Sequence, residues 1–326
     1  MTKKAVSAQP PVGHRIAAKP INATSSLDQR MVDYYSTAGL DYEPWSANFN
    51  MHFGYYRWPL NPLRREGLLK QMNREVYARL GLADDRPQQL IDLGCGVGAA
   101  AKFGVAEYSN ASVTAITIVP WQIEKALELT PAALIDNRIA YQLADFRQTP
   151  YPDASFDAAY AIESSCYDRG LGKRAFLTES ARILKPGATL VVADGFRIPL
   201  TASKFFEYCF SGTCEGWSLD TFAQTDAFAA AAVEAGFDPP KFENVSLAVT
   251  PSVLHVPWVS LKYWWQEHRR HRNSQSSTEI RKNHLKAPLL GMLTGAQFWN
   301  YAYFLVTLRR SCSRKEELCE GSQVGG

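Results

Sequence analysis

The chain has 326 residues, 46% of them hydrophobic, and a formal net charge of +3 from 35 Lys and Arg against 32 Asp and Glu. That charge is too small to indicate a nucleic-acid partner, and no apolar run approaches the roughly 18 residues that a membrane span needs. The six cysteines show no metal-ligand spacing, and the N-terminus lacks the apolar core of a signal peptide, so we expect a cytoplasmic protein with reduced thiols.

The first part of the chain divides into a polar tail and a helical cap. Residues 1–27 lack hydrophobic periodicity and are predicted to be a disordered tail. Residues 28–40 and 62–80 have helical spacing, and an aromatic stretch, 42–58, lies between them. We therefore interpret 28–80 as an N-terminal helical cap that also supplies a substrate-binding segment.

Strands and helices alternate through the middle of the chain. Short apolar runs predict strands, and the segments of helical spacing between them predict helices. The predicted strands are 89–94, 112–118, 139–145, 156–163 and 188–196, and the predicted helices are 120–129 and 172–183. This order predicts a mostly parallel sheet with helices on both faces.

The pattern loosens after residue 197. The expected elements are helices within 202–235, a strand at 241–249, an aromatic and basic helical segment at 252–272, and a final strand at 300–310. The expected fold is therefore an α/β, doubly wound, Rossmann-like domain over 81–310 with a seven-stranded sheet. Residues 250–299 are an insertion before the last strand, placed to act as a lid, and 311–326 are a C-terminal tail.

A glycine-rich turn follows the first of these strands. Gly94, Gly96 and Gly98 are spaced as Gly-x-Gly-x-Gly, and Asp92 precedes them within the strand. Glycines let the backbone turn tightly and approach a ligand without an intervening side chain, and ligands bind at this carboxyl edge of a parallel sheet. The spacing differs from the Gly-x-Gly-x-x-Gly turn that nicotinamide and flavin enzymes use.

The combination of this turn and the preceding acid resembles motif I of class I S-adenosylmethionine-dependent methyltransferases. Further segments are similar to that family: Asp145-Phe146 after the third strand, 152–157 before the fourth, and 182–188 before the fifth. The resemblance implies S-adenosylmethionine as the cofactor, bound by the three glycines, with Asp145 and Phe146 beside its adenine.

The second strand departs from the usual pattern of the family. Thr117 stands where most members have an Asp or Glu that binds the ribose, and Gln122 is expected to assist it. Sterol C-methyltransferases and cyclopropane fatty acid synthases, as families, also lack the acid there. This similarity favours methylation of an alkene carbon.

Residues 34–56 resemble the aromatic N-terminal region of sterol C-methyltransferases in a Tyr-Tyr pair, a Trp and a His-Phe pair. The resemblance implies Tyr35 at the cofactor, His52 and Phe53 at the substrate, and Tyr55 at the reacting centre. Methyl transfer to an alkene leaves a carbocation, and each aromatic face stabilises a cation by roughly 0.5–2 kcal/mol. Packing of the core or of a lid is the alternative role for each of these aromatic residues.

The fourth strand ends in Ile-Glu-Ser-Ser-Cys-Tyr, which is similar to an Ile-Glu-Ala-Thr-Cys-His segment of sterol C-methyltransferases. Glu163 then lies at the carboxyl end of the strand and faces the cofactor edge. A carboxylate with a raised pKa in an apolar pocket can remove a proton next to the carbocation and stabilise the cation, so we interpret Glu163 as the catalytic base. The alternative is a ligand to the cofactor or to a backbone amide.

Aromatic and basic residues of the later chain are the remaining candidates. The aromatic residues expected at a large apolar cavity or its lid are Phe206, Trp217 and Trp264, with Trp217 at the reacting centre. Arg269, Arg272 and, from the N-terminal part, Arg57 are placed to pair with a diphosphate, for which Mg²⁺ would be a second cofactor. A solvated helix face is the ordinary alternative for such a charge run.

The sequence supports four hypotheses about function. The preferred one is C-methylation of a prenyl diphosphate, such as geranyl or farnesyl diphosphate, through a carbocation that then loses a proton. The second is C-methylation of a sterol or triterpenoid, the third is methylation of a phenol, quinol or amine, and the fourth is a non-catalytic or cyclase-like binding protein. The intact glycine turn and Asp145 argue against the fourth. The expected partner is a small isoprenoid molecule, and a homo-oligomer is compatible with the sequence.

Overall fold

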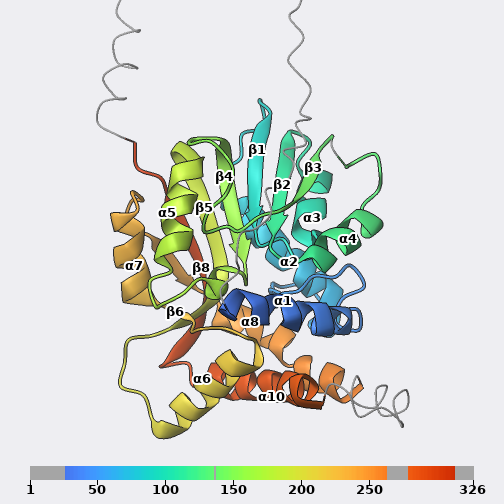
Figure 1. The fold of residues 1–326 in the computed structure, drawn as a ribbon, viewed down its shortest axis with the longest axis vertical. Helices are drawn as coiled ribbons and strands as arrows, with labels where there is room; N and C mark the ends of the chain where they lie inside the picture. Colours follow the sequence, from blue (N-terminus) through green and yellow to red (C-terminus); the bar gives the residue numbers. More distant parts are fainter. Residues whose placement is uncertain (1–25, 136, 263–277, 313–326) are drawn as a thin grey trace, which may run out of the picture.

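The computed structural model describes residues 26–135, 137–262 and 278–312, and a sheet lies at their centre (Figure 1). Its strands are β1 (Gln88–Leu93), β2 (Ala111–Thr117), β3 (Ile139–Leu143), β4 (Phe156–Ile162), β5 (Leu184–Arg197), β7 (Lys241–Asn244) and β8 (Tyr301–Arg309). They lie in the order β3-β2-β1-β4-β5-β8-β7, and a two-residue strand, β6 (Ala223–Gln224), pairs with β5.

The direction of the winding reverses in the middle of this sheet. β1 pairs in parallel with β2 on one side and with β4 on the other, and β8 alone runs antiparallel to its two neighbours. The chain therefore builds outward from β1 in both directions, and a switch point lies between β1 and β4. Ligands of open α/β sheets bind in the crevice outside the carboxyl ends of the strands at such a point.

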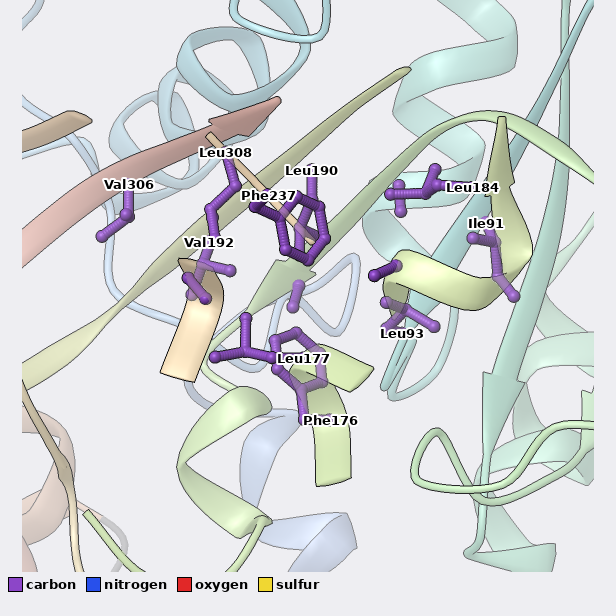
Figure 2. Close-up of a cluster of buried hydrophobic side chains, with 14 of the residues drawn as sticks. Ile91, Leu93, Phe176, Leu177, Leu184, Leu190, Val192, Phe237, Val306 and Leu308 are labelled. Carbon is purple, nitrogen blue, oxygen red and sulfur yellow. The ribbon is translucent and has the colours of Figure 1, made fainter. Parts of the chain in front are cut away.

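Apolar side chains of alternate residues in each strand fill the two faces of the sheet. On one face, Ile91 and Leu93 of β1 lie in the cluster of Figure 2 with Phe176 and Leu177 of α5 (Arg174–Ile183), and α7 (Thr225–Glu234) covers the same cluster. On the other face, Leu90 packs with residues of α2 (Arg65–Ala78) and α3 (Ala99–Glu107). Since successive strand residues point to opposite faces, one strand serves both cores.

The remaining helices gather at the carboxyl end of the parallel strands (Figure 1). They are α1 (Ser26–Ala38), the short helices η1 (Gly39–Tyr42) and η2 (Ser165–Tyr167), α6 (Lys204–Gly216), α8 (Ser246–Val253) and α10 (Thr278–Gly295), while α4 (Pro120–Leu129) follows β2. In the part of the chain that the structure describes, no helix combines the length and apolar character needed to cross a bilayer.

The architecture confirms the predicted doubly wound α/β fold, with β6 as an addition to the seven expected strands. One strand prediction is wrong in extent: the segment predicted as a strand at 241–249 leaves the sheet after Asn244, and α8 begins at Ser246. The Asn244 side chain accepts a hydrogen bond from the Ser246 backbone N–H, so a local turn replaces the sheet ladder there. The helix predicted from residue 28 begins at Ser26, and residues 1–25 lie outside the described part.

We predict opposite effects for two glycine-to-alanine changes in neighbouring helices. A Cβ atom at Gly104 of α3 would collide with the ring of Tyr77 in α2, whereas a Cβ at Gly67 of α2 meets nothing within 4 Å. Gly104→Ala should therefore lower the free energy of unfolding by about 1–3 kcal/mol, because the packed interface must open. Gly67→Ala should raise it by up to about 1 kcal/mol through helix propensity. Denaturant unfolding of both variants measures this, and a stabilising Gly104→Ala would contradict the packing.

Candidate active site

Two adjoining cavities lie at the carboxyl end of the sheet, where β1 and β4 end. The first is lined by the glycine turn, by the ends of β1, β2 and β4, and by α1. The second is lined mainly by aromatic residues from the N-terminal cap, the segment after β4, the ends of β5 and β8, and the helical residues 256–262. The switch point of the sheet thus carries a site with two compartments.

The backbone of the glycine turn forms part of the first cavity. Gly94 and Gly96 line it with φ values of +107° and +52°, conformations that favour glycine. A Cβ at Gly94 would collide with the Ser164 side chain. Gly98 has a different role, because it is the N-cap of α3 and a Cβ there would strike Tyr141. The structure therefore brings two of the three glycines to the cavity surface.

Asp92 presents an unpaired carboxyl oxygen at this cavity. The residue is 2% exposed, and its Oδ2 has no hydrogen-bond partner among the described residues. Burial raises its pKa to about 8, against a smaller lowering by the hydroxyl of Tyr160, which in turn accepts a hydrogen bond from Tyr77 at 2.9 Å. An unsatisfied buried acceptor of this kind fits a cationic or hydrogen-bond-donating group of a ligand.

Thr117 and Gln122, the predicted substitutes for the ribose-binding acid, lie together in the first cavity. The Thr117 hydroxyl donates to Oε1 of Gln122 at 2.6 Å and accepts from the Val119 backbone N–H at 3.2 Å. Among the residues that the structure describes, the amide Nε2 of Gln122 has only the Met51 sulfur, at 3.9 Å, as a partner. Because that contact is weak, the amide of Gln122 remains a donor for a ligand hydroxyl.

A chain of ion pairs connects the N-terminal cap to residues that line the first cavity. Asp145 and Phe146 both line it, as predicted. Arg147 contacts both carboxylate oxygens of Asp145, at 2.6 Å for the Nη2–Oδ2 pair, and also reaches Asp28 of α1 at 2.8 Å. Phe146 packs edge-on against Phe176. A carboxylate beside an aromatic ring suits an adenine amino group and its ring plane.

The residues of the first cavity fit S-adenosylmethionine. At Gly94 and Gly96 only backbone lines the cavity, so the cofactor, which joins a nucleoside to an amino acid, can lie close to it. The unpaired oxygen of Asp92 suits the ammonium group of that amino acid. Gln122 and Asp145 line the same cavity, as their predicted roles at the ribose and at the adenine require. Tyr35 of α1 covers the cavity and shares a hydrogen bond of 2.9 Å between hydroxyls with Tyr167.

The second cavity has an aromatic wall and two carboxyl groups. Its carboxyl groups belong to Glu163 and Asp194, and the described residues of its wall include no Lys or Arg. The aromatic residues of the wall are Tyr35, Tyr42, Trp45, Phe53, Tyr167, Trp217, Phe222, Tyr301 and Tyr303. Such a wall suits an apolar substrate that passes through a cationic state.

Five residues line both cavities and so mark where the compartments meet: Tyr35, Met51, His52, Glu163 and Tyr167. A group that passes from a ligand in the first cavity to a ligand in the second must cross at this junction. His52 is held there by Phe53, whose carbonyl oxygen lies 2.8 Å from Nδ1, and burial lowers the pKa of the imidazole.

Glu163 is the carboxyl group at the junction. Its backbone is left-handed, with a φ of +49°, which is rare for a residue with a side chain and is common at functional sites. Oε1 accepts hydrogen bonds from the Phe53 backbone N–H at 2.7 Å and from the Tyr303 hydroxyl at 2.8 Å. Oε2 has no partner among the described residues. Burial outweighs these two donors and raises the pKa of Glu163 to about 8.

Asp194 at the end of β5 was not singled out from the sequence. Its Oδ2 accepts from the Ser165 hydroxyl at 2.7 Å and from the Cys166 backbone N–H at 3.0 Å, and burial raises its pKa. The buried ammonium of Lys173 holds the same loop through the carbonyl oxygens of Cys166 and Asp168. In the sequence, the only sign of this site residue is an Asp that follows the apolar run of β5.

Several predicted site residues lie elsewhere. Tyr55 lines neither cavity, since it packs against the face of the sheet that α2 covers. Arg57 is exposed and pairs with Glu75 at 3.5 Å. Phe206 of α6 is fully buried in a cluster behind the wall of the second cavity and does not line the cavity itself. These three placements correct the predicted roles of the residues, because none of their side chains reaches the cavity wall. Trp264, Arg269 and Arg272 lie outside the described residues.

Residues of the second cavity that the sequence did not suggest come from separate parts of the chain. They are Phe222, Tyr301 and Tyr303, together with Asp194. Tyr42, Trp45 and Tyr167 also line the cavity, and they lie in segments 34–56 and 162–167, which were singled out from the sequence. Over the described ranges, no cluster of three His, Cys, Asp or Glu residues is arranged to hold a metal ion. The predicted Mg²⁺ therefore stays a prediction.

Asp92→Asn should affect the stability of the protein and its affinity for the cofactor in opposite directions. The folded pKa of about 8 lies far above the ordinary value of 3.8, so the wild-type protein loses stability as the pH rises from about 4 through 8. The Asn variant cannot ionise, so its stability relative to the wild type should increase over that range. Its affinity for S-adenosylmethionine should fall by about tenfold or more, because a charged hydrogen bond is lost. Thermal unfolding against pH and calorimetric titration test both parts, and unchanged affinity would remove Asp92 from the cofactor site.

Solved structures with this fold carry out more than one kind of chemistry. The chain superposes on the [4+2]-cyclase SpnF with a TM-score of 0.66 at 20% identity, covering 89% of this chain and 98% of that one. It superposes on the geranyl diphosphate C-methyltransferase of Streptomyces coelicolor A3(2) with a TM-score of 0.63 at 16% identity, covering 88% and 98%. At these identities the likeness shows the shared fold alone.

Relatives in sequence are methyltransferases of several kinds. The family described as "Methyltransferase domain" matches residues 91–192. The O-methyltransferase resE of Aspergillus sclerotiorum is 38% identical over 44% of this chain. The match covers 53% of the length of that relative. The 24-methylenesterol C-methyltransferase 2 of Oryza sativa subsp. japonica is 30% identical over 70% of this chain and 60% of its own length. Methyltransferase GfsG of Streptomyces halstedii is 30% identical over 70% of this chain and 79% of its own. This chain belongs to the class I S-adenosylmethionine-dependent methyltransferases, as the glycine turn and the first cavity indicate.

Proposed function

We propose that the protein transfers the methyl group of S-adenosylmethionine to an alkene carbon of an apolar isoprenoid, through a carbocation that then loses a proton. The observation that carries this proposal is the position of Glu163. Its half-buried carboxyl group stands where the glycine-lined cavity meets the aromatic one. A base at that position reaches the carbons next to the one that receives the methyl group.

The cofactor, when bound, would supply an electrophilic methyl group and leave as S-adenosylhomocysteine, which keeps the electron pair of the broken S–CH3 bond. The substrate supplies the electron pair of its double bond. The new C–C bond leaves a positive charge on the neighbouring substrate carbon. Aromatic residues at and beyond the junction, such as Tyr35, Tyr167 and Trp217, line the space in which that charge forms. Each aromatic face contributes roughly 0.5–2 kcal/mol to stabilising such a cation.

Glu163 completes the reaction as the proton acceptor. Hydrogen bonds from Phe53 and Tyr303 fix Oε1, so Oε2 is the oxygen left to take a proton from carbon. Loss of that proton returns the C–H electron pair to the substrate as a new double bond and neutralises the cation. The ionised carboxylate also stabilises the cation electrostatically before the proton moves, because the site has a low dielectric.

The lining of the second cavity favours an uncharged substrate. Glu163 and Asp194 offer a diphosphate no positive charge, and no basic residue stands among the described residues of the wall. Of the basic residues that suggested a diphosphate, Arg57 lines neither cavity, and Arg269 and Arg272 lie outside the described part of the chain. We therefore place a neutral sterol or triterpenoid ahead of a prenyl diphosphate as the substrate class.

O-Methylation of a hydroxyl group is the second candidate function. The relatives named as O-methyltransferases favour it, and so does the chemistry of the junction. A carboxylate of raised pKa at Glu163 can accept a proton from a substrate hydroxyl as well as from carbon. The atom that receives the methyl group therefore distinguishes the two candidates.

The substrate class is tested with a radiolabelled methyl donor and four acceptors: geranyl diphosphate, farnesyl diphosphate, a sterol and a quinol. We expect label in the sterol, on carbon. Label only in a diphosphate would reverse the order of the substrate classes, and label on oxygen would remove the carbon-methylation proposal.

Glu163→Gln should lower the rate of product formation by about 10²-fold or more while S-adenosylmethionine affinity stays within about twofold of wild type. Glutamine keeps an oxygen that accepts from Phe53 and Tyr303, so the geometry is preserved while the base is lost. Activity of the wild-type protein should rise with pH through about 8, since the carboxylate must be ionised. Loss of cofactor binding in the variant would instead assign Glu163 to the first cavity.

Tyr303→Phe tests the role of Glu163 by changing its pKa while its carboxyl group stays in place. The Tyr303 hydroxyl lowers the pKa of Glu163 by donating to its carboxylate. Its removal should shift the rising limb of the pH–activity profile to higher pH, and activity above that limb should largely recover. A profile that stays at the wild-type position would show that Glu163 is not the group that titrates.

A further inference from the structure

A strip of exposed apolar residues follows α8 and the helical residues 256–262 after it. Leu247, Leu254, Trp258 and Leu261 are separated by seven, four and three positions, so they fall on one side of a helical path. The path continues between the two helices, because Leu254 keeps a right-handed helical backbone and the Val259 N–H donates to the carbonyl of the residue four before it. The exposed fractions of the four side chains range from 58% to 89%.

A second segment extends this strip. Trp58 is 81% exposed and Leu63 is 80% exposed, in the loop that precedes α2. The imidazole Nε2 of His255 lies 2.9 Å from the carbonyl oxygen of Pro62, which joins this loop to the turn after α8. We call these six residues, Trp58, Leu63, Leu247, Leu254, Trp258 and Leu261, the apolar strip. Exposed apolar surface of this kind marks contact with a protein or a membrane.

The two chain segments that carry the apolar strip contain charges of one sign. Residues 57–64 and 245–262 contain no Asp or Glu, and three exposed basic residues flank the strip: Arg57, Arg64 and Lys262. Arg57 reaches Glu75 at 3.5 Å, yet 70% of its side chain stays exposed. Tryptophan and leucine bordered by Arg and Lys form the composition with which interfacial helices enter anionic lipid surfaces.

The helix behind the apolar strip also forms a wall of the second cavity. Val256, Val259 and Ser260 line that cavity, while Trp258 and Leu261 of the same helix are exposed. A single helical layer therefore separates the apolar cavity from the strip. A substrate of the class proposed above dissolves poorly in water and partitions into lipid.

We propose that the apolar strip docks on an anionic lipid surface and that the substrate enters the second cavity from there. The tryptophan and leucine side chains enter the interfacial region, and Arg57, Arg64 and Lys262 contact the headgroups. The identity of the substrate that enters the cavity rests on the proposed function. Docking of the apolar strip on lipid does not depend on catalysis.

Co-sedimentation of the full chain with phosphatidylcholine vesicles, with and without phosphatidylglycerol, tests the docking. We expect binding that strengthens with phosphatidylglycerol and weakens as salt is added. The double variant Trp58→Ser/Trp258→Ser should lower the partition coefficient by about tenfold or more. The matched control is Leu127→Ser/Val233→Ser, which changes exposed apolar residues of α4 and α7 instead and should bind as the wild type does.

Equal sedimentation with and without vesicles, or equal binding by the Trp58→Ser/Trp258→Ser variant, would overturn the proposal. A dimer in analytical ultracentrifugation that this variant abolishes would also overturn it, and would assign the apolar strip to a second copy of the chain. Binding is measured without cofactor or substrate. Failure of the methylation assay therefore removes the proposed function and leaves the docking result intact.

Discussion

Burial of two carboxyl groups, Asp92 and Glu163, at the end of neighbouring strands controls the chemistry of this site. In each case desolvation outweighs the hydrogen bonds and raises the pKa to about 8. Burial of an ionisable group costs stability, and proteins retain such groups mainly where function requires them. Asp92 keeps an oxygen unpaired toward the first cavity, and Glu163 keeps one toward the junction. In the proposed reaction, the first oxygen is the acceptor for the cofactor and the second is the acceptor for a substrate proton.

The N-terminal cap encloses these two carboxyl groups through contacts with residues that line the first cavity. Arg147 links Asp28 of α1 to Asp145, the acid of the first cavity, and Tyr35 of α1 meets Tyr167 above the junction. A helix that precedes the sheet in the chain is therefore anchored at two points of the carboxyl edge. In the proposed reaction, this helix helps to enclose the junction, and exclusion of water there would protect the cation and strengthen electrostatic interactions.

The proposed choice of carbon methylation over oxygen methylation rests on residues away from the glycine turn. Relatives named for both reactions match this chain. In the proposed reaction, the wall of the second cavity and the group at the junction face the substrate. Here the wall is aromatic, and a carboxyl group of raised pKa stands at the junction. The aromatic wall favours the proposed cationic intermediate, whereas the carboxyl group can accept a proton from either a carbon or a hydroxyl group.

The sequence alone determined the doubly wound sheet, the glycine turn and the positions of Thr117, Asp145 and Glu163, because each depends on local periodicity or on a short contiguous motif. Only the tertiary structure decided which aromatic residues share a wall. Trp45, Trp217 and Tyr303 come from segments far apart in the chain, and nothing local distinguishes them from Tyr55 or Phe206, which pack elsewhere. The raised pKa of Glu163 likewise depends on burial by those distant segments, which no run of neighbouring residues encodes.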